Sequence, residues 1–396
     1  MIHNSPDYLR AVAYLETLQR YFYERDPIAK RFADAARQSD NDDDLRRFAQ
    51  LAYEGYMPYF PGEISFDQFF EMWKRSWIDP PTRYEHRISY SIIYRLAERI
   101  ESAAAALRLN PAKTPIFGTI PTGRLNGIAA PVDNARYYVI ILDRGVFAIA
   151  NIFSSLIGQF ISPVNAMRSS GRGVDTNKVS LAIRPEHEDL LFELVTNYVI
   201  AGEPHLTPKK PGSIGHEPIS SAMLAGMELF IVGHEYAHCA KGHLDRGKII
   251  RRAFPGRIAI DEVCPDWKDE YEADFYGWLL TERVFDVDGT STLLRSVGAE
   301  SVFYVIEMLD KARSVLLYGE ERESESCSHP PAKQRIERLR SAMFNEFGRR
   351  GAAHAEIQRM CQLADAVRWF IDTSYSRFRA ELVRMHNEGV EVYERL

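Results

Sequence analysis

The residues with the clearest chemical potential are two histidines and a glutamate in the segment GHEYAH: His234, Glu235 and His238. The surrounding residues are apolar with helical spacing, and on an α-helix positions four apart lie on one face. His234 and His238 could therefore bind one metal ion, with Glu235 beside it. This H-E-x-x-H spacing is typical of zinc sites in which the glutamate acts as a general base.

A catalytic zinc ion usually has three protein ligands, so a third ligand is needed. His243 is a poor candidate, because on a continuous helix it would lie roughly 140° around the axis from His238. Glu270 is a better candidate, and the alternatives are Glu272, Asp269 and Glu262. Asp274 shares a helical face with Glu270, whereas Glu272 points to the opposite side. Asp274 could thus accept the second ring N–H of a ligating histidine.

Three ordered motifs extend this pattern: HEYAHCAKGH, then EYEAD, then SHPP followed by Arg335-Ile336. In this order they resemble the gluzincin metallopeptidases of the HtpX and CAAX prenyl protease family. The resemblance covers about residues 131–339. It implies a zincin-like core and a peptidase activity. Well-known members of that family carry transmembrane helices, so membrane-protein or prenyl-protein substrates are not expected here.

The resemblance also implies roles for individual residues. The implied ligands of one zinc ion per chain are His234, His238 and Glu270, with Glu235 as the general base. Asp274 and Arg335 would support the ligands from behind. His329 would face the substrate carbonyl, and we expect it to stabilise the developing oxyanion.

The only strong strand signal is the run YYVIIL, Tyr137 to Leu142. Asn134-Ala135 before it is similar to the Asn-Ala element that leads into the substrate-binding edge strand of the same family. We therefore expect a protein or peptide substrate to add as a strand along Tyr137 to Leu142, contacting Asn134, Tyr138 and Ile140.

The rest of the sequence predicts a predominantly helical α+β protein. Residues 1–110 form a helical N-terminal region, 111–345 the zincin-like domain with a small sheet, and 346–396 a C-terminal helix that packs on the core. The motif helix is expected to begin at Ser220 or Ser221 and to end near Gly242, and the next helix to be capped by Asp266. Further helices are expected at about 291–318, 331–347 and 357–394.

Composition excludes several classes. The formal net charge is −6, with basic and acidic residues interleaved, which argues against nucleic-acid binding. Four widely spaced cysteines and the lack of an N-terminal signal pattern indicate a reducing, cytoplasmic location. The uncharged run Val146 to Ser162 is short for a membrane span and contains several polar residues. We interpret it as a core helix, so no stable membrane insertion is expected.

Three functions fit these observations. The first is a zinc-dependent endopeptidase of broad specificity. The second is a target-specific protease of the phage-exclusion (Lit-like) type that acts on one cellular protein. The third, from another class, is an inactive zinc-binding scaffold or regulator. The presence of Glu235 beside both histidines favours an enzyme.

Overall fold

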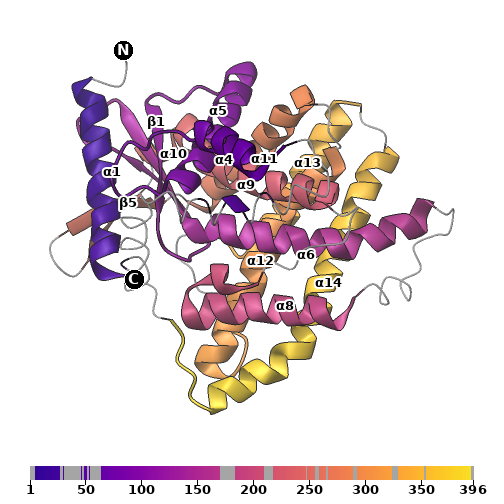
Figure 1. The fold of residues 1–396 in the computed structure, drawn as a ribbon. Helices are drawn as coiled ribbons and strands as arrows, with labels where there is room; N and C mark the ends of the chain where they lie inside the picture. Colours follow the sequence, from indigo (N-terminus) through magenta and orange to yellow (C-terminus); the bar gives the residue numbers. More distant parts are fainter. Residues whose placement is uncertain are drawn as a thin grey trace.

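The structure is a computed structural model. It describes residues 5–26, 64–169, 183–208, 217–246, 248–254, 258–264, 266–288, 292–322, 329–351 and 354–393, with single positions 30, 46, 49, 50 and 53. Within these residues the protein is predominantly helical with a small sheet, so the predicted α+β class is confirmed. Figure 1 shows the strands on one side of the molecule and long helices across the rest.

The helices are α1 (Pro6–Arg25), α4 (Phe66–Arg75), α5 (Arg87–Leu107), α6 (Arg144–Ser169), α8 (Pro185–Thr196), α9 (Glu217–Ala240), α10 (His243–Arg246), α11 (Trp267–Asp288), α12 (Thr292–Tyr318), α13 (Ala332–Arg349) and α14 (His354–Asn387). A π-helical turn η2 (Asn197–Ala201) and a 3-10 turn η3 (Pro204–Leu206) follow α8. The motif helix α9 begins slightly earlier than predicted. Asp266 caps α11 as predicted, since its Oδ1 accepts the Asp269 N–H at 2.9 Å.

The strands are β1 (Thr114–Ile120), β2 (Gly127–Pro131), β3 (Tyr137–Asp143), β4 (Lys248–Phe254) and β5 (Ile258–Cys264). β4 and β5 form an antiparallel hairpin that the sequence pattern did not predict. β3 lies between the other two strands of its sheet, parallel to β1 and antiparallel to β2. The expectation that substrate adds along Tyr137 to Leu142 is therefore wrong, because both edges of β3 are already hydrogen-bonded.

The two faces of β3 belong to different parts of the core. Val139 and Ile141 pack against α1, which covers one face of the sheet (Figure 1). Tyr138, Ile140 and Leu142 join the main core, to which α5, α6, α9 and α12 contribute. Because successive strand residues point to opposite faces, an uninterrupted apolar run is what a strand buried on both faces requires.

The apolar helix α6 is part of this main core. Among the described residues it is the one helix long and apolar enough to cross a membrane, and 72% of its window Arg144–Ile161 is buried inside the protein. Phe153, Leu156 and Ile157 have no exposed surface. This burial agrees with the prediction of a core helix.

A close crossing of α9 and α11 sets the position of the histidines. Gly233 of α9 faces Gly277 of α11, so neither helix has a side chain at the contact. A Cβ added to Gly277 would lie 2.8 Å from the backbone nitrogen and 3.0 Å from the Cα of His234. Only glycine permits this approach, which places His234 against the first turns of α11.

We expect Gly277→Ala to destabilise the protein and to weaken metal binding. The added methyl group meets rigid backbone, a steric cost of about 1–3 kcal/mol, against about 1 kcal/mol of helix propensity gained. The helices must separate, which moves His234 away from α11. Urea unfolding and zinc titration would measure both effects. Gly348→Ala on α13 is the matched control, because its Cβ would meet nothing within 4 Å. Equal behaviour of the two variants would contradict this account.

Candidate metal centre

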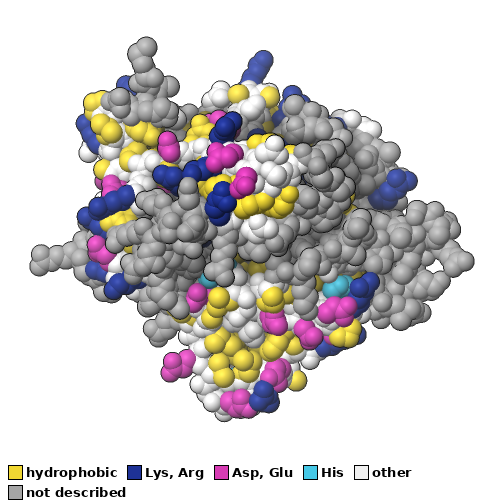
Figure 2. Space-filling view, in the orientation of Figure 1, with side chains coloured by type: hydrophobic (Ala, Val, Ile, Leu, Met, Phe, Trp, Pro, Cys, Tyr) yellow, Lys and Arg dark blue, Asp and Glu magenta, His cyan; other side chains and the backbone are white. Residues whose placement is uncertain are grey.

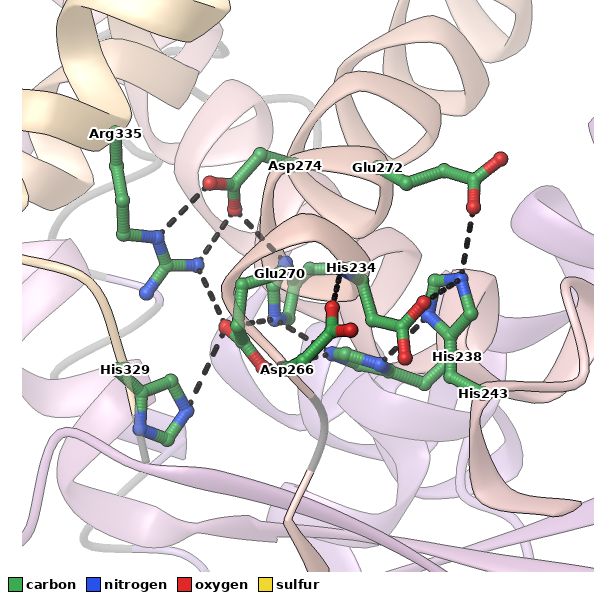
Figure 3. Close-up of polar contacts among 10 residues, drawn as sticks. His234, His238, His243, Asp266, Glu270, Glu272, Asp274, His329 and Arg335 are labelled. Carbon is green, nitrogen blue, oxygen red and sulfur yellow. Dashed lines mark hydrogen bonds and ion pairs between the residues drawn. The ribbon is translucent and has the colours of Figure 1, made fainter. Parts of the chain in front are cut away.

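Three buried residues from two helices form a group that could hold a metal ion. His234 and His238 come from consecutive turns of α9, and Glu270 comes from the first turn of α11 (Figure 3). The two Nε2 atoms lie 3.1 Å apart. Glu270 Oε2 is 3.6 Å from His234 Nε2, and Oε1 is 3.4 Å from His238 Nε2. All three ligand atoms lie within 4.8 Å of one another.

The surroundings of Glu270 fit a bound cation. Its side chain is only 1% exposed, and within the described residues neither carboxylate oxygen accepts a hydrogen bond. The closest histidine nitrogen is 3.4 Å away, beyond the about 2.7–3.2 Å of an N–H···O bond. A buried carboxylate without donors is costly unless a cation compensates it. The contact with His238, followed by the influence of His234 and His329, outweighs burial and holds the pKa of Glu270 well below its usual range.

Asp274 and Arg335 lie next to the His/His/Glu group and contact it without belonging to it. Asp274 Oδ1 lies 2.9 Å from His234 Nδ1, on the side of the ring opposite Nε2. Arg335, from α13, donates to both Asp274 oxygens, at 2.9 Å and 2.5 Å. Its guanidinium also lies 4.7 Å from the centre of the Phe303 ring. Burial alone would raise the pKa of Asp274, but Arg335 outweighs it and lowers that pKa. Asp274 therefore stays anionic and can orient the ring of His234.

His243, which the sequence marked as a poor candidate for the third ligand, lies outside the His/His/Glu group but contacts it. α9 ends at Ala240, and Gly242 turns the chain with a φ of +68°. The short helix α10 then starts at His243. His243 is fully buried, with its Nδ1 3.0 Å from His238 Nδ1. Its Nε2 lies 3.1 Å from Glu272 Oε2, so Glu272 binds His243 rather than the His/His/Glu group.

We expect His243→Ala to lower zinc affinity about 10–100-fold, the effect usual for a residue that orients a ligand. Without His243, the Nδ1 of His238 loses its partner, and the ring is no longer fixed. Competition with a chromogenic chelator would measure the affinity. His205→Ala is the control, since His205 is 38% exposed and pairs with Glu203 at 3.5 Å, away from the centre. Unchanged affinity in His243→Ala would show that the contact does not position His238.

Glu235 lies at a cavity that opens beside the group. The cavity has a volume of about 300 Å³ and is lined by residues that include His234, Glu235, His329 and Arg335. A Cβ on Gly127 would lie 2.7 Å from Glu235 Oε1, so the first residue of β2 must be a glycine for Glu235 to keep this position. Burial raises the pKa of Glu235 above its ordinary value. A raised pKa suits a carboxylate that must accept and release a proton near neutral pH.

His329 lies just before α13, on the wall of the same cavity. Its Nε2 is 3.7 Å from Glu270 Oε2, and its side chain is 43% exposed. It can therefore be reached by a molecule in the cavity. Arg335, six residues later, approaches Glu270 Oε2 at 3.5 Å from the same helix start. The segment from His329 to Arg335 thus approaches Glu270 with two side chains, His329 and Arg335, as Figure 3 shows.

The structure does not bring Asn134, Tyr138 and Ile140 to the cavity. Tyr138 and Ile140 are fully buried in β3, and the Tyr138 hydroxyl donates to Asp245. Asn134 lies in the loop between β2 and β3, with a φ of 55° and its carbonyl bonded to Arg10. The strand residue that lines the cavity is Gly127 of β2, which the sequence analysis did not single out.

Comparison of the chain with protein-family models, with curated proteins and with solved structures finds no match. The resemblance noted in the sequence therefore remains a likeness of motifs and their order. The structure shows that the protein is mostly helical and contains a buried His/His/Glu group that could hold a metal ion.

Proposed function

We propose that the protein is a zinc-dependent endopeptidase. The observation that carries this proposal is the buried Glu270 carboxylate, which accepts no hydrogen bond from the described residues and faces the Nε2 atoms of His234 and His238 beside Glu235. Two imidazoles and one carboxylate are a ligand set of catalytic zinc sites. Tetrahedral zinc with Zn–N bonds of about 2.0–2.1 Å separates two nitrogens by roughly 3.4 Å, close to the 3.1 Å observed.

Each residue of the candidate centre has a distinct role in this proposal. A zinc ion held by His234, His238 and Glu270 would supply a Lewis acid that polarises a carbonyl group and lowers the pKa of water. Glu235 accepts the proton of the attacking water and delivers it to the leaving amine. His329 donates a hydrogen bond to the carbonyl oxygen as negative charge develops on it.

The strand β2 offers a place for an extended substrate. β2 is an edge strand of its sheet, and Gly127 at its start lines the cavity beside Glu235. A peptide that pairs with this edge would bind through main-chain hydrogen bonds, with little dependence on sequence. Its backbone would then pass Glu235 at the point where β2 enters the cavity. Edge pairing at β2 replaces the binding along β3 that the sequence suggested.

The surface charge supports a protein substrate over a nucleic acid. On the face shown in Figure 2, described Lys and Arg side chains alternate with Asp and Glu side chains. The formal net charge of the whole chain is −6. A nucleic-acid binder needs clustered basic residues to neutralise phosphates, and the described side chains on this face do not form such a cluster.

The test is zinc-dependent hydrolysis of unfolded casein. Purified protein is expected to hold one zinc ion per chain, to cut casein internally, to lose activity after chelation and to regain it with added zinc. His238→Ala should neither bind zinc at that stoichiometry nor cut. Zinc binding without cutting would refute the broad endopeptidase. If expression were also toxic, and Glu235→Gln relieved the toxicity, the target-specific alternative would be favoured.

A further inference from the structure

A second group of possible metal ligands lies beside the first, on the other side of His238. Its members are His243 from the start of α10 and Asp269 and Glu272 from the first turns of α11. Positions three apart on a helix are neighbours, so the two carboxylates share a face of α11. Figure 3 shows His243 and Glu272 on the side of His238 away from His329. None of the three residues lines the cavity, so this group is separate from the proposed substrate space.

The distances within this second group match those that a zinc ion requires. His243 Nε2 lies 3.1 Å from Glu272 Oε2 and 3.6 Å from Asp269 Oδ1. The three ligand atoms lie within 4.8 Å of one another. Ligand atoms bound to tetrahedral zinc at about 2.0–2.1 Å are roughly 3.4 Å apart, which falls between the two measured distances. By this measure the second group is as well arranged for an ion as the His/His/Glu group.

Asp269 lacks the hydrogen bonds expected of a largely buried carboxylate. Its side chain is 15% exposed, and the two basic side chains that face it within the described residues, His243 and Arg246, are 3.6 Å and 3.7 Å away. Both distances exceed the about 3.2 Å limit of an N–H···O bond. The hydrogen on His243 Nε2 can serve only one carboxylate, and Glu272 at 3.1 Å is the closer. A hydrogen bond thus accounts for the position of Glu272 but not for that of Asp269, whereas a cation between the three atoms accounts for both.

Two basic side chains at the rim of the group limit its affinity for a cation. Lys241 Nζ lies 3.1 Å from Glu272 Oε1, the carboxylate oxygen that does not bond His243. Arg246 donates to two backbone carbonyls of the turn before α10, and its side chain is 62% exposed. It can therefore turn toward solvent when an ion binds at Asp269. Because both side chains repel a cation, the second group should bind metal more weakly than the first.

The contact between His238 and His243 links the two groups. Their Nδ1 atoms are 3.0 Å apart, which leaves room for a single hydrogen between them. A neutral imidazole that binds metal through Nε2 carries its hydrogen on Nδ1. If both rings bound an ion in this way, two hydrogens would face each other, and the rings would have to move apart. An ion at the first group therefore opposes an ion at the second.

We propose that His243, Asp269 and Glu272 form a second metal site, which takes a divalent transition-metal ion only when zinc is in excess. One imidazole and two carboxylates suit zinc better than magnesium, which binds imidazole poorly and keeps most of its water. The two carboxylates are partly exposed, so water can complete the coordination. This site does not depend on the proposed peptidase function.

The experiment counts the zinc ions bound to the full-length protein. Titration calorimetry with zinc chloride should show one tight and one weaker ion per chain, and excess magnesium should not displace the weaker one. Glu272→Gln and Asp269→Asn preserve the shape of partly exposed side chains, so each variant should lose the weaker ion and keep the tight one. Glu186→Gln is the matched control and should still bind both ions. Glu186 on α8 is likewise partly exposed and lies 3.8 Å from Arg184, outside both groups.

A crystal soaked in excess zinc locates the second ion. Anomalous scattering should give a peak between the three ligand atoms. A single ion per chain in excess zinc, or a weaker ion that persists in both variants, would overturn the proposal. A second peak elsewhere would also overturn it, because the weaker ion would then be adventitious. None of these results involves casein, so a protein that binds two ions without cutting would refute the peptidase and leave the second site standing.

Discussion

Glu235→Gln is expected to lower the rate of casein hydrolysis by about 10²–10⁴-fold, the usual contribution of a general acid–base group, while the protein keeps its zinc. Glutamine has the shape of glutamate but cannot accept the proton of the attacking water. Glu235 lies on the cavity wall against Gly127. It does not belong to the His/His/Glu group that could hold the metal. Zinc analysis and initial rates on one preparation would show both results.

Glu228→Gln is the matched control for this variant. Glu228 lies on the same helix two turns earlier, and burial raises its pKa to about 8, but it does not line the cavity. The same chemical change at this position should leave hydrolysis unaffected. A Glu235→Gln variant that cuts casein at the normal rate would contradict the proposed mechanism. Loss of zinc in that variant would show instead that Glu235 helps to hold the metal.

The part of the site that lies on single helices was predictable from the sequence. His234 and His238 are related by the fixed geometry of an α-helix, and so are Glu270 and Asp274. The order of the motifs linked these two pairs and added Arg335. The structure then shows Arg335 bonded to Asp274, a contact between segments far apart in the chain that periodicity alone could not place.

The position of His243 was missed because its direction was judged on a continuous helix, although the helix was expected to end near Gly242. Gly242 has a positive φ, and the change of direction there carries His243 back to His238. A glycine just after an apolar helix is a common C-terminal signal. Treating Gly242 as a reversal, and not only as an end, could have identified the contact between the two histidines.

The substrate strand was assigned wrongly because the Asn134-Ala135 element before it was taken as the sign of an edge strand. Tyr137 to Leu142 is apolar without alternation, a pattern typical of strands buried on both faces. The edge strand β2 contains Gly127, Ala129 and Ala130, whose weak strand propensity gave no signal. Nor does the sequence of α12 distinguish Ile306, which faces the cavity, from its neighbours in the core.

Arg335→Met is expected to destabilise the metal-free protein by about 3–5 kcal/mol, the usual cost of removing one partner of a buried ion pair. Asp274 is 1% exposed and accepts two charge-assisted hydrogen bonds from Arg335. Without the guanidinium, the carboxylates of Asp274 and Glu270 remain buried near each other. Urea unfolding would measure the loss. Arg349→Met, at an exposed position of the same helix, is the control and should leave the unfolding midpoint unchanged.

The double variant Asp274→Leu/Arg335→Met separates the structural effect from the effect on the metal. Removing both charges eliminates the unpaired Asp274 carboxylate, so much of the stability lost in Arg335→Met should return. Zinc affinity should stay low, because the Nδ1 of His234 has lost the carboxylate oxygen that lies 2.9 Å from it. If the double variant were as unstable as the single one, the loss would come from packing around Phe303. If it bound zinc normally, Asp274 would not orient His234.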